Sequence, residues 1–171
     1  MRTTHTSRVL STSAAVALAI TALSAAPALA DGSGSGGESL LRAGLVGSMP
    51  APASPMIATI KPGGAPWVNG PSPVRVRKDG RITISISGLV IPDPPGTGVN
   101  PIASVVATLV CGNMVAGSTA PFALSSTGNG RTSDVVAVPA QCENPTVLIQ
   151  PALNRAVYIA SAFGDERESD G

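Results

Sequence analysis

The chain has 171 residues, and its 11 basic and 10 acidic side chains leave a formal net charge of +1 at pH 7. A near-neutral chain of this length forms one domain and has no general attraction for nucleic acid or for an anionic membrane surface. Its only aromatic residues are one Trp, one Tyr and two Phe, so its core must consist mainly of Val, Ile, Leu and Ala.

Residues 1–30 have the parts of a cleavable export signal. Arg2 and Arg8 give a positive start, and an apolar run follows at residues 9–23. The segment closes with Ala-Leu-Ala at residues 28–30, the small-x-small pattern that signal peptidase reads. The apolar run is shorter than the roughly 20 residues that span a bilayer. We therefore expect cleavage after residue 30, no membrane span, and a product that is secreted or held at the cell wall.

Cleavage after residue 30 changes the chemistry of the chain. It leaves 141 of the 171 residues and a formal net charge of −1, because two arginines leave with the signal. The single histidine, His5, leaves as well, which excludes Ser-His-Asp and Cys-His chemistry and any His-ligated metal site. The two cysteines, Cys111 and Cys142, remain, and an isolated pair in an exported protein most simply forms a disulfide.

Residues 31–56 have the composition of a flexible linker. Gly and Ser dominate its start, Pro alternates with Ala and Ser at its end, and residues 39–46 are apolar enough for only one or two helical turns. Residues 164–171 are acidic and are expected to form a disordered, solvated tail. We therefore expect one folded domain at residues 57–163, about the size of an immunoglobulin domain.

The clearest expected strands are residues 74–77 and 82–87, in which apolar and polar side chains alternate. A two-residue turn between them would place a charge on the apolar face. A three-residue loop instead sets Val76 opposite Ile82, and so predicts a hairpin with Gly80 in the left-handed conformation.

Further strands are expected at short intervals, separated by turn residues. They cover residues 102–111, 114–118, 131–138, 146–150 and 156–162, with a tight turn at Gly112-Asn113. About seven short strands predict an all-β fold, an immunoglobulin-like antiparallel β-sandwich with Greek-key connections. Because Cys111 and Cys142 lie at or just beyond strand ends, we expect the disulfide to tie an edge or corner of the sandwich.

Six short runs between residues 65 and 162 stand out as a set. They are Ala65-Pro66-Trp67, Asp79-Gly80-Arg81, Gly88-Leu89-Val90-Ile91-Pro92, Val99-Asn100-Pro101, Leu109-Val110-Cys111-Gly112 and Ala156-Val157-Tyr158-Ile159-Ala160. In these runs the chain resembles a group of uncharacterised secreted single-domain proteins from actinobacteria. The resemblance implies export and a single disulfide. It brings no known activity, so no functional residue is carried over.

The densest charge of the domain is the cluster Arg75, Arg77, Lys78 and Arg81. In the predicted hairpin its three arginines share one outward face, where they can hold an anionic wall polymer through several contacts. The cluster is also typical of a solvated strand face that blocks edge-to-edge association. No aromatic residues alternate with it, so a nucleic-acid surface is not expected.

The Pro- and Gly-rich segment 92–101 is the longest expected loop, and long loops on sandwiches often carry recognition. Asp93 and Asn100 lie in it and are candidate ligand contacts, although Pro and Gly also serve as simple punctuation between strands. Trp67 is a further candidate, as an exposed anchor for a sugar or peptide. A lone Trp also commonly packs within its own domain.

The acids of the domain lack the paired spacing that glycoside hydrolysis needs. We expect no enzyme activity, no cofactor and no metal site, although calcium at Asp93 or Asp134 stays open. Two functions remain. One is a binding or adhesion module for a cell-wall polymer or extracellular protein, and the other is a non-catalytic structural spacer of the cell envelope. An enzyme without histidine chemistry is a minor third.

Overall fold

The computed structural model describes residues 37–164. The predicted export signal and the acidic residues 165–171 lie outside this part. Residues 37–164 contain strands and no helix, so the all-β prediction is confirmed, and a membrane-spanning helix is absent from them. The strands are β1 (Ser39–Gly44), β2 (Val46–Gly47), β3 (Lys61–Pro62), β4 (Pro73–Arg77), β5 (Arg81–Ile86), β6 (Ser104–Cys111), β7 (Met114–Ser118), β8 (Phe122–Ala123), β9 (Gly130–Val135), β10 (Thr146–Pro151), β11 (Val157–Tyr158) and β12 (Ala160–Phe163).

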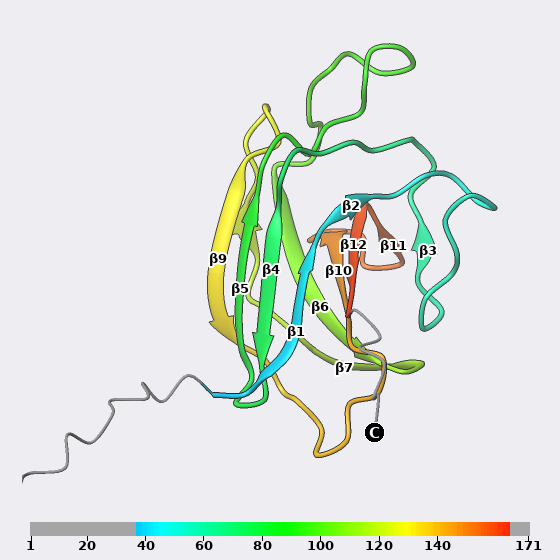
Figure 1. The fold of residues 1–171 in the computed structure, drawn as a ribbon. Coiled ribbons are helices and arrows are strands. Elements are labelled where there is room, and N and C mark those ends of the chain that lie inside the picture. The colour runs from blue at the N-terminus through cyan, green and yellow to red at the C-terminus, as the bar shows by residue number, and fades with distance from the viewer. Residues whose placement is uncertain (1–36, 165–171) are drawn as a thin grey trace, which may run out of the picture. The chain divides into compact units, whose positions relative to one another are not determined.

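These strands form two large antiparallel sheets and one small parallel pair. The first sheet has the order β1-β4-β5-β9, and the second has the order β2-β12-β10-β6-β7, with β8 also pairing β6. The small pair is β3 with β11. Figure 1 shows the first sheet as one layer and β6, β10 and β12 as a second layer beside it. Because β1 pairs β4 and β2 pairs β12, the chain passes from one sheet to the other between residues 44 and 46.

The larger buried cluster lies between the two sheets. Every second residue of β4 and β5 points into it: Val74, Val76, Ile82, Ile84 and Ile86 are at most 3% exposed. The second sheet contributes Val105, Ala107, Leu109, Val147 and Ile149, all 0% exposed. Fully burying one Val or Ile side chain is worth about 1.5–3 kcal/mol. The alternation predicted for β4 and β5 is therefore confirmed, and it holds the two layers together.

The hairpin between β4 and β5 has the predicted register. Val76 lies opposite Ile82 and Val74 lies opposite Ile84. Gly80 has a φ of 87°, in the left-handed region, and its N–H donates to the Arg77 carbonyl oxygen over 3.0 Å. The three-residue loop 78–80 therefore directs the β4 and β5 arginines away from the core.

The prediction of a linker over residues 31–56 is wrong for residues 39–47, which form β1 and β2. Leu41 and Leu45 are 2% and 5% exposed and belong to the core between the sheets. Sequence alone suggests at most one or two helical turns in this segment, which would be too short to be stable in isolation. Its partner is β4, which lies about thirty residues further along the chain and whose open edge supplies the hydrogen bonds.

The Pro-rich segment 50–55 also belongs to the folded domain. The Tyr158 hydroxyl donates to the Pro55 carbonyl oxygen over 2.6 Å, and the Ser54 hydroxyl oxygen accepts from the Met49 N–H over 2.8 Å. Ile57 and Ile60 then form an antiparallel bridge. Composition alone predicts a linker here, but tertiary contacts hold the segment in place.

The expected seven strands and immunoglobulin-like connectivity are not confirmed. β4 and β5 are neighbours both in sequence and in one sheet, whereas the second and third strands of an immunoglobulin domain lie in different sheets. The expected strand 131–138 ends at Val135, and the expected strand 156–162 is split into β11 and β12. The tight turn after β6 is confirmed, with Cys111 opposite Met114.

Asp134 links the two sheets where β9 lies beside the β7–β8 connection. Its carboxylate accepts the N–H groups of Ala120 and Val135, each over 2.8 Å. These two hydrogen bonds, that from Ala120 first, hold the pKa of Asp134 below its ordinary value of 3.8. The folded state therefore favours the ionised carboxylate, so this contribution to stability is present above pH 3.8 and is lost as the pH falls through the lower folded-state pKa.

We predict that Asp134→Asn destabilises the protein at neutral pH, because the amide places an N–H group where a carboxylate oxygen now accepts one. It should also weaken the dependence of stability on acid pH: between about pH 5 and about pH 2, the melting temperature of the variant should fall less than that of wild type. Thermal melts followed by circular dichroism measure this. Asp93→Asn makes the same charge change in an exposed loop, and identical profiles for the two variants would contradict the assignment.

We predict that Gly80→Ala destabilises the protein more than Gly112→Ala. Both glycines have positive φ, at 87° and 59°, so both alanines cost about 1–2 kcal/mol of backbone strain. A Cβ at Gly80 would also meet the Val136 carbonyl oxygen at 2.3 Å, whereas a Cβ at Gly112 meets nothing within 4 Å. Urea unfolding of both variants checks this, and equal losses of stability would disprove the close approach at Gly80.

Candidate functional site

The outer face of the second sheet is covered by its own chain. Val110 and Leu148 point outward from β6 and β10 and pack against Ile60 and Tyr158, which form the second buried cluster with them. Beside this cluster, the Thr108 hydroxyl donates to Oε1 of Gln150, which is 2% exposed. This face therefore offers little surface to a ligand.

The outer face of the first sheet is open and carries five arginines. We call this surface the arginine face: it consists of Arg42 on β1, Arg75 and Arg77 on β4, Arg81 on β5 and Arg131 on β9. Arg77 is half-buried and the other four are exposed. Since Arg155 is the only other arginine in residues 37–164, nearly all guanidinium groups of the folded part lie on one side.

The register of the sheet brings like charges together. Arg42 lies directly opposite Arg75 on the neighbouring strand, where side chains start only about 5 Å apart. Arg77 and Arg81 flank the three-residue hairpin loop from its two strands. Like charges placed directly opposite each other destabilise a sheet. The pairing of Arg42 with Arg75 therefore lowers the stability of the sheet unless a bound anion neutralises the two guanidinium groups.

Two shallow depressions of about 410 Å³ each lie along this face. The first is lined by the four arginines of β1, β4 and β5 together with Thr83 and Ser85. The second is lined by residues 85–87 and 129–131, among them Ser85, Asn129 and Arg131. Ser85 belongs to both, so the depressions adjoin across β5. Hydroxyl and amide groups lie between guanidinium groups, which suits a ligand that carries several anionic groups and polar links.

Counter-charges for these arginines are missing from residues 37–164. The one salt bridge in this part joins Lys78 Nζ to Glu38 Oε1 over 2.8 Å, beside the hairpin loop. Asp134 lies opposite Ile82, so its side chain is on the inner side of the first sheet. Asp79 Oδ1 accepts the Arg81 N–H within the loop, over 3.0 Å.

Trp67 is not an exposed anchor. It is 5% exposed and belongs to the core between the sheets, so it follows the alternative in which a lone Trp packs within its own domain. Its backbone supports the β1–β2 crossing, because the Trp67 N–H donates to the Ser48 carbonyl oxygen over 2.8 Å. With so few aromatic residues in the chain, this large side chain fills the core.

Asn100 is a structural brace for the 92–101 loop. It is 6% exposed, and its amide nitrogen donates to the carbonyl oxygens of Ile102 and Ser125 while its Oδ1 accepts the Ile102 N–H. With these bonds made, Asn100 is not free for a ligand. Asp93 is exposed in the same loop, and neither of the two depressions on the arginine face is lined by residues of this loop.

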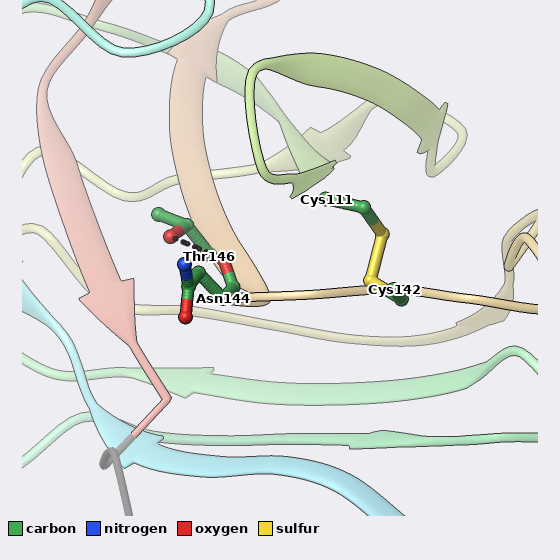
Figure 2. The surroundings of a disulfide bond; sticks show 4 residues. All are labelled: Cys111, Cys142, Asn144 and Thr146. Carbon is green, nitrogen blue, oxygen red and sulfur yellow. Dashed lines mark hydrogen bonds between the residues drawn. A yellow bond between two sulfur atoms is a disulfide. The ribbon is translucent and has the colours of Figure 1, made fainter.

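The predicted disulfide is present between Cys111 and Cys142. Figure 2 shows it joining the end of β6 to the segment that leads into β10, close to the Thr146 hydroxyl that donates to the Asn144 carbonyl oxygen. The Gly112 N–H also donates to the Glu143 carbonyl oxygen over 2.7 Å. As expected, the bridge ties a corner of the fold and lies apart from the antibody-like central position.

The acids do not gather into a metal-binding group in the described part of the chain. No group of three His, Cys, Asp or Glu side chains there can hold a metal ion. Both carboxylate oxygens of Asp134 accept backbone N–H groups.

Sequence reasoning identified three of the five arginines on the face. It missed Arg42, which fell in the predicted linker, and Arg131, which lies in an expected strand but faces Ser85 only through the pairing of β5 with β9. Residues 130–135 show no alternation of apolar and polar side chains that could have indicated that Arg131 points outward. The sequence near β9 does not show which strand pairs with it.

Comparisons of the chain with protein-family models, with curated proteins and with solved structures found no match.

We predict that Cys111→Ala with Cys142→Ala lowers the free energy of unfolding by roughly 3 to 4 kcal/mol, because the bridge closes a loop with a sequence separation of 31. Urea unfolding of the double variant and of wild type, each with and without dithiothreitol, measures the difference. Reduction should destabilise wild type alone. An unchanged unfolding midpoint in the variant would show that the bridge does not stabilise the fold.

Proposed function

We propose that this chain is a secreted, non-catalytic binding module that holds an anionic polymer of the cell envelope on its arginine face. The observation that carries the proposal is the grouping of five arginines on one open sheet face, with no acidic partner in residues 37–164. A two-sheet antiparallel sandwich, immunoglobulin-like in its layers and different in its connectivity, remains our proposal for the class of scaffold.

The geometry favours an extended ligand with repeated charges. Neighbouring strands are about 4.8 Å apart, and residues two apart on one strand are about 6.7 Å apart. The arginines of β1, β4 and β5 therefore offer guanidinium groups at intervals that phosphodiester or carboxylate groups of a polymer can meet in succession. Monovalent anions gain only one such contact.

The face lacks what a nucleic-acid surface needs. Trp67 and Tyr158 are buried, and Phe163 lies on β12 of the second sheet. Single-stranded nucleic acid is usually held by bases that stack on aromatic side chains. An acidic polysaccharide or a poly(polyol phosphate) requires no such stacking, so it fits the face better.

We predict that Arg42→Ser, Arg75→Ser and Arg81→Ser each lower the affinity for lipid-free poly(glycerol phosphate) or polygalacturonate about two- to fivefold, as expected for exposed ion pairs. Binding of fluorescently labelled polymer, followed by anisotropy, measures this. It should weaken as ionic strength rises, because exposed charges are screened. Neutral dextran should not bind.

The stability of the same variants separates a binding role from a structural one. Removing Arg42 or Arg75 relieves the repulsion between them, so the free energy of unfolding should stay constant or rise while binding falls. Arg155→Ser, which lies outside the face, is the matched control and should leave binding unchanged. If no anionic polymer is retained at low salt, the binding proposal fails and the spacer alternative takes its place.

A further inference from the structure

The folded part of the chain ends in the second sheet, beside the edge strand of the sheet that carries the arginine face. β12 pairs β2 through Ala160 with Gly47 and Ser161 with Val46, and it also packs against β1, the edge strand of the first sheet. Figure 1 shows β12 next to the β1–β2 segment. The Gly164 N–H donates to the Pro145 carbonyl oxygen over 3.0 Å, which fixes the point where the chain leaves the fold.

The charges on the two sides of this point are opposite. Residues 37–164 contain eight basic and five acidic side chains, a formal charge of +3. The next seven residues, Asp165-Glu166-Arg167-Glu168-Ser169-Asp170-Gly171, carry four acids and one arginine, a formal charge of −3. We call residues 165–171 the acidic segment. Its formal charge of −3 equals in size the formal charge of +3 on residues 37–164.

The acidic segment is long enough to cover the site. Seven residues span at most about 23–25 Å when extended. Arg42 is on β1, whose Cα atoms approach those of β12 to within 8 Å, and Arg75 is on the next strand, about 4.8 Å further, so both strands lie within roughly 13 Å of β12. Arg77 and Arg81 lie further along and are still within this reach.

From this placement we propose that the acidic segment docks on the arginine face and competes there with anionic polymers. The inference rests on the proposed function, since it concerns the regulation of that same surface. Docking relieves the repulsion between Arg42 and Arg75 when no polymer is bound. A polymer with many charges displaces the segment, whereas a sparsely charged one does not, so the segment raises the selectivity of the site.

The test uses two opposite changes in the acidic segment. A quadruple variant, Asp165→Asn, Glu166→Gln, Glu168→Gln and Asp170→Asn, removes the negative charges at constant size. Arg167→Gln makes the segment more acidic. Because all five positions lie outside residues 37–164, the melting temperature serves as the check that both variants keep the wild-type fold.

The first measurement needs no ligand. Nuclear magnetic resonance of the arginine side-chain Nε–Hε groups should show shifts at Arg42 and Arg75 between wild type and the quadruple variant at low salt. The Arg155 signal should stay in place. At about 1 M salt, where the screening length is only about 3 Å, the spectra of the two proteins should coincide. Identical low-salt spectra would overturn the docking of the segment.

The second measurement uses labelled poly(glycerol phosphate). The quadruple variant should bind it roughly two- to tenfold more tightly than wild type at low salt, and Arg167→Gln should bind it more weakly, in line with weak exposed ion pairs. If the spectra and the affinities of both variants match wild type while Arg75→Ser still loses binding, the inference fails and the proposed function stands. If the polymer fails to bind even the quadruple variant, the proposed function fails, and the spectra alone decide the docking.

Discussion

Burial of alternate residues of β4 and β5 is the constraint on which the arginine face depends. Val76 and Ile82 are both 0% exposed, and each is followed or preceded in its strand by an arginine. Because side chains alternate strictly along a strand, a slip of one residue would bury guanidinium groups and expose the core. The core therefore also fixes which side of the sheet is basic.

The two sheets use their outer faces differently. In the second sheet, β6 and β10 are buried on both faces, because Ile60 and Tyr158 cover the outward Val110 and Leu148. The bond from the Tyr158 hydroxyl to Pro55 holds the covering segment down. The first sheet has no such cover among residues 37–164. Among residues 37–164, the outer face of the first sheet is therefore a broad open face, and it is the one that concentrates positive charge.

The parts of this fold that sequence reasoning predicted are those decided by local periodicity. The β4–β5 hairpin follows from alternation and from one loop glycine, both within about fifteen residues. Strand β1 was missed because its partner β4 lies some thirty residues away, and the pairing of β5 with β9 places Arg131 on the face across a longer gap. Such pairings depend on the three-dimensional arrangement.

Single-residue expectations failed for a related reason. The side chains of Trp67 and Asn100 are of types that can either contact a ligand or stabilise the fold. The sequence around them does not distinguish these two roles. In a core with few aromatic residues, the one Trp is needed for burial. In a long loop without regular hydrogen bonds, an Asn that bonds to Ile102 and Ser125 holds the loop to the sheet.

Near-neutral net charge hides a strong separation of charge along this chain. The formal charge of +3 on residues 37–164 is opposed by −3 on residues 165–171, so the total says little about the surface a ligand meets. Repulsion between Arg42 and Arg75 is not offset by an ion pair within residues 37–164, and an anion bound at the face lowers it. A polymer and the acidic segment are chemically equivalent in this respect. Occupancy of the face by either one therefore follows from the same electrostatic cost, and competition between them is the direct consequence.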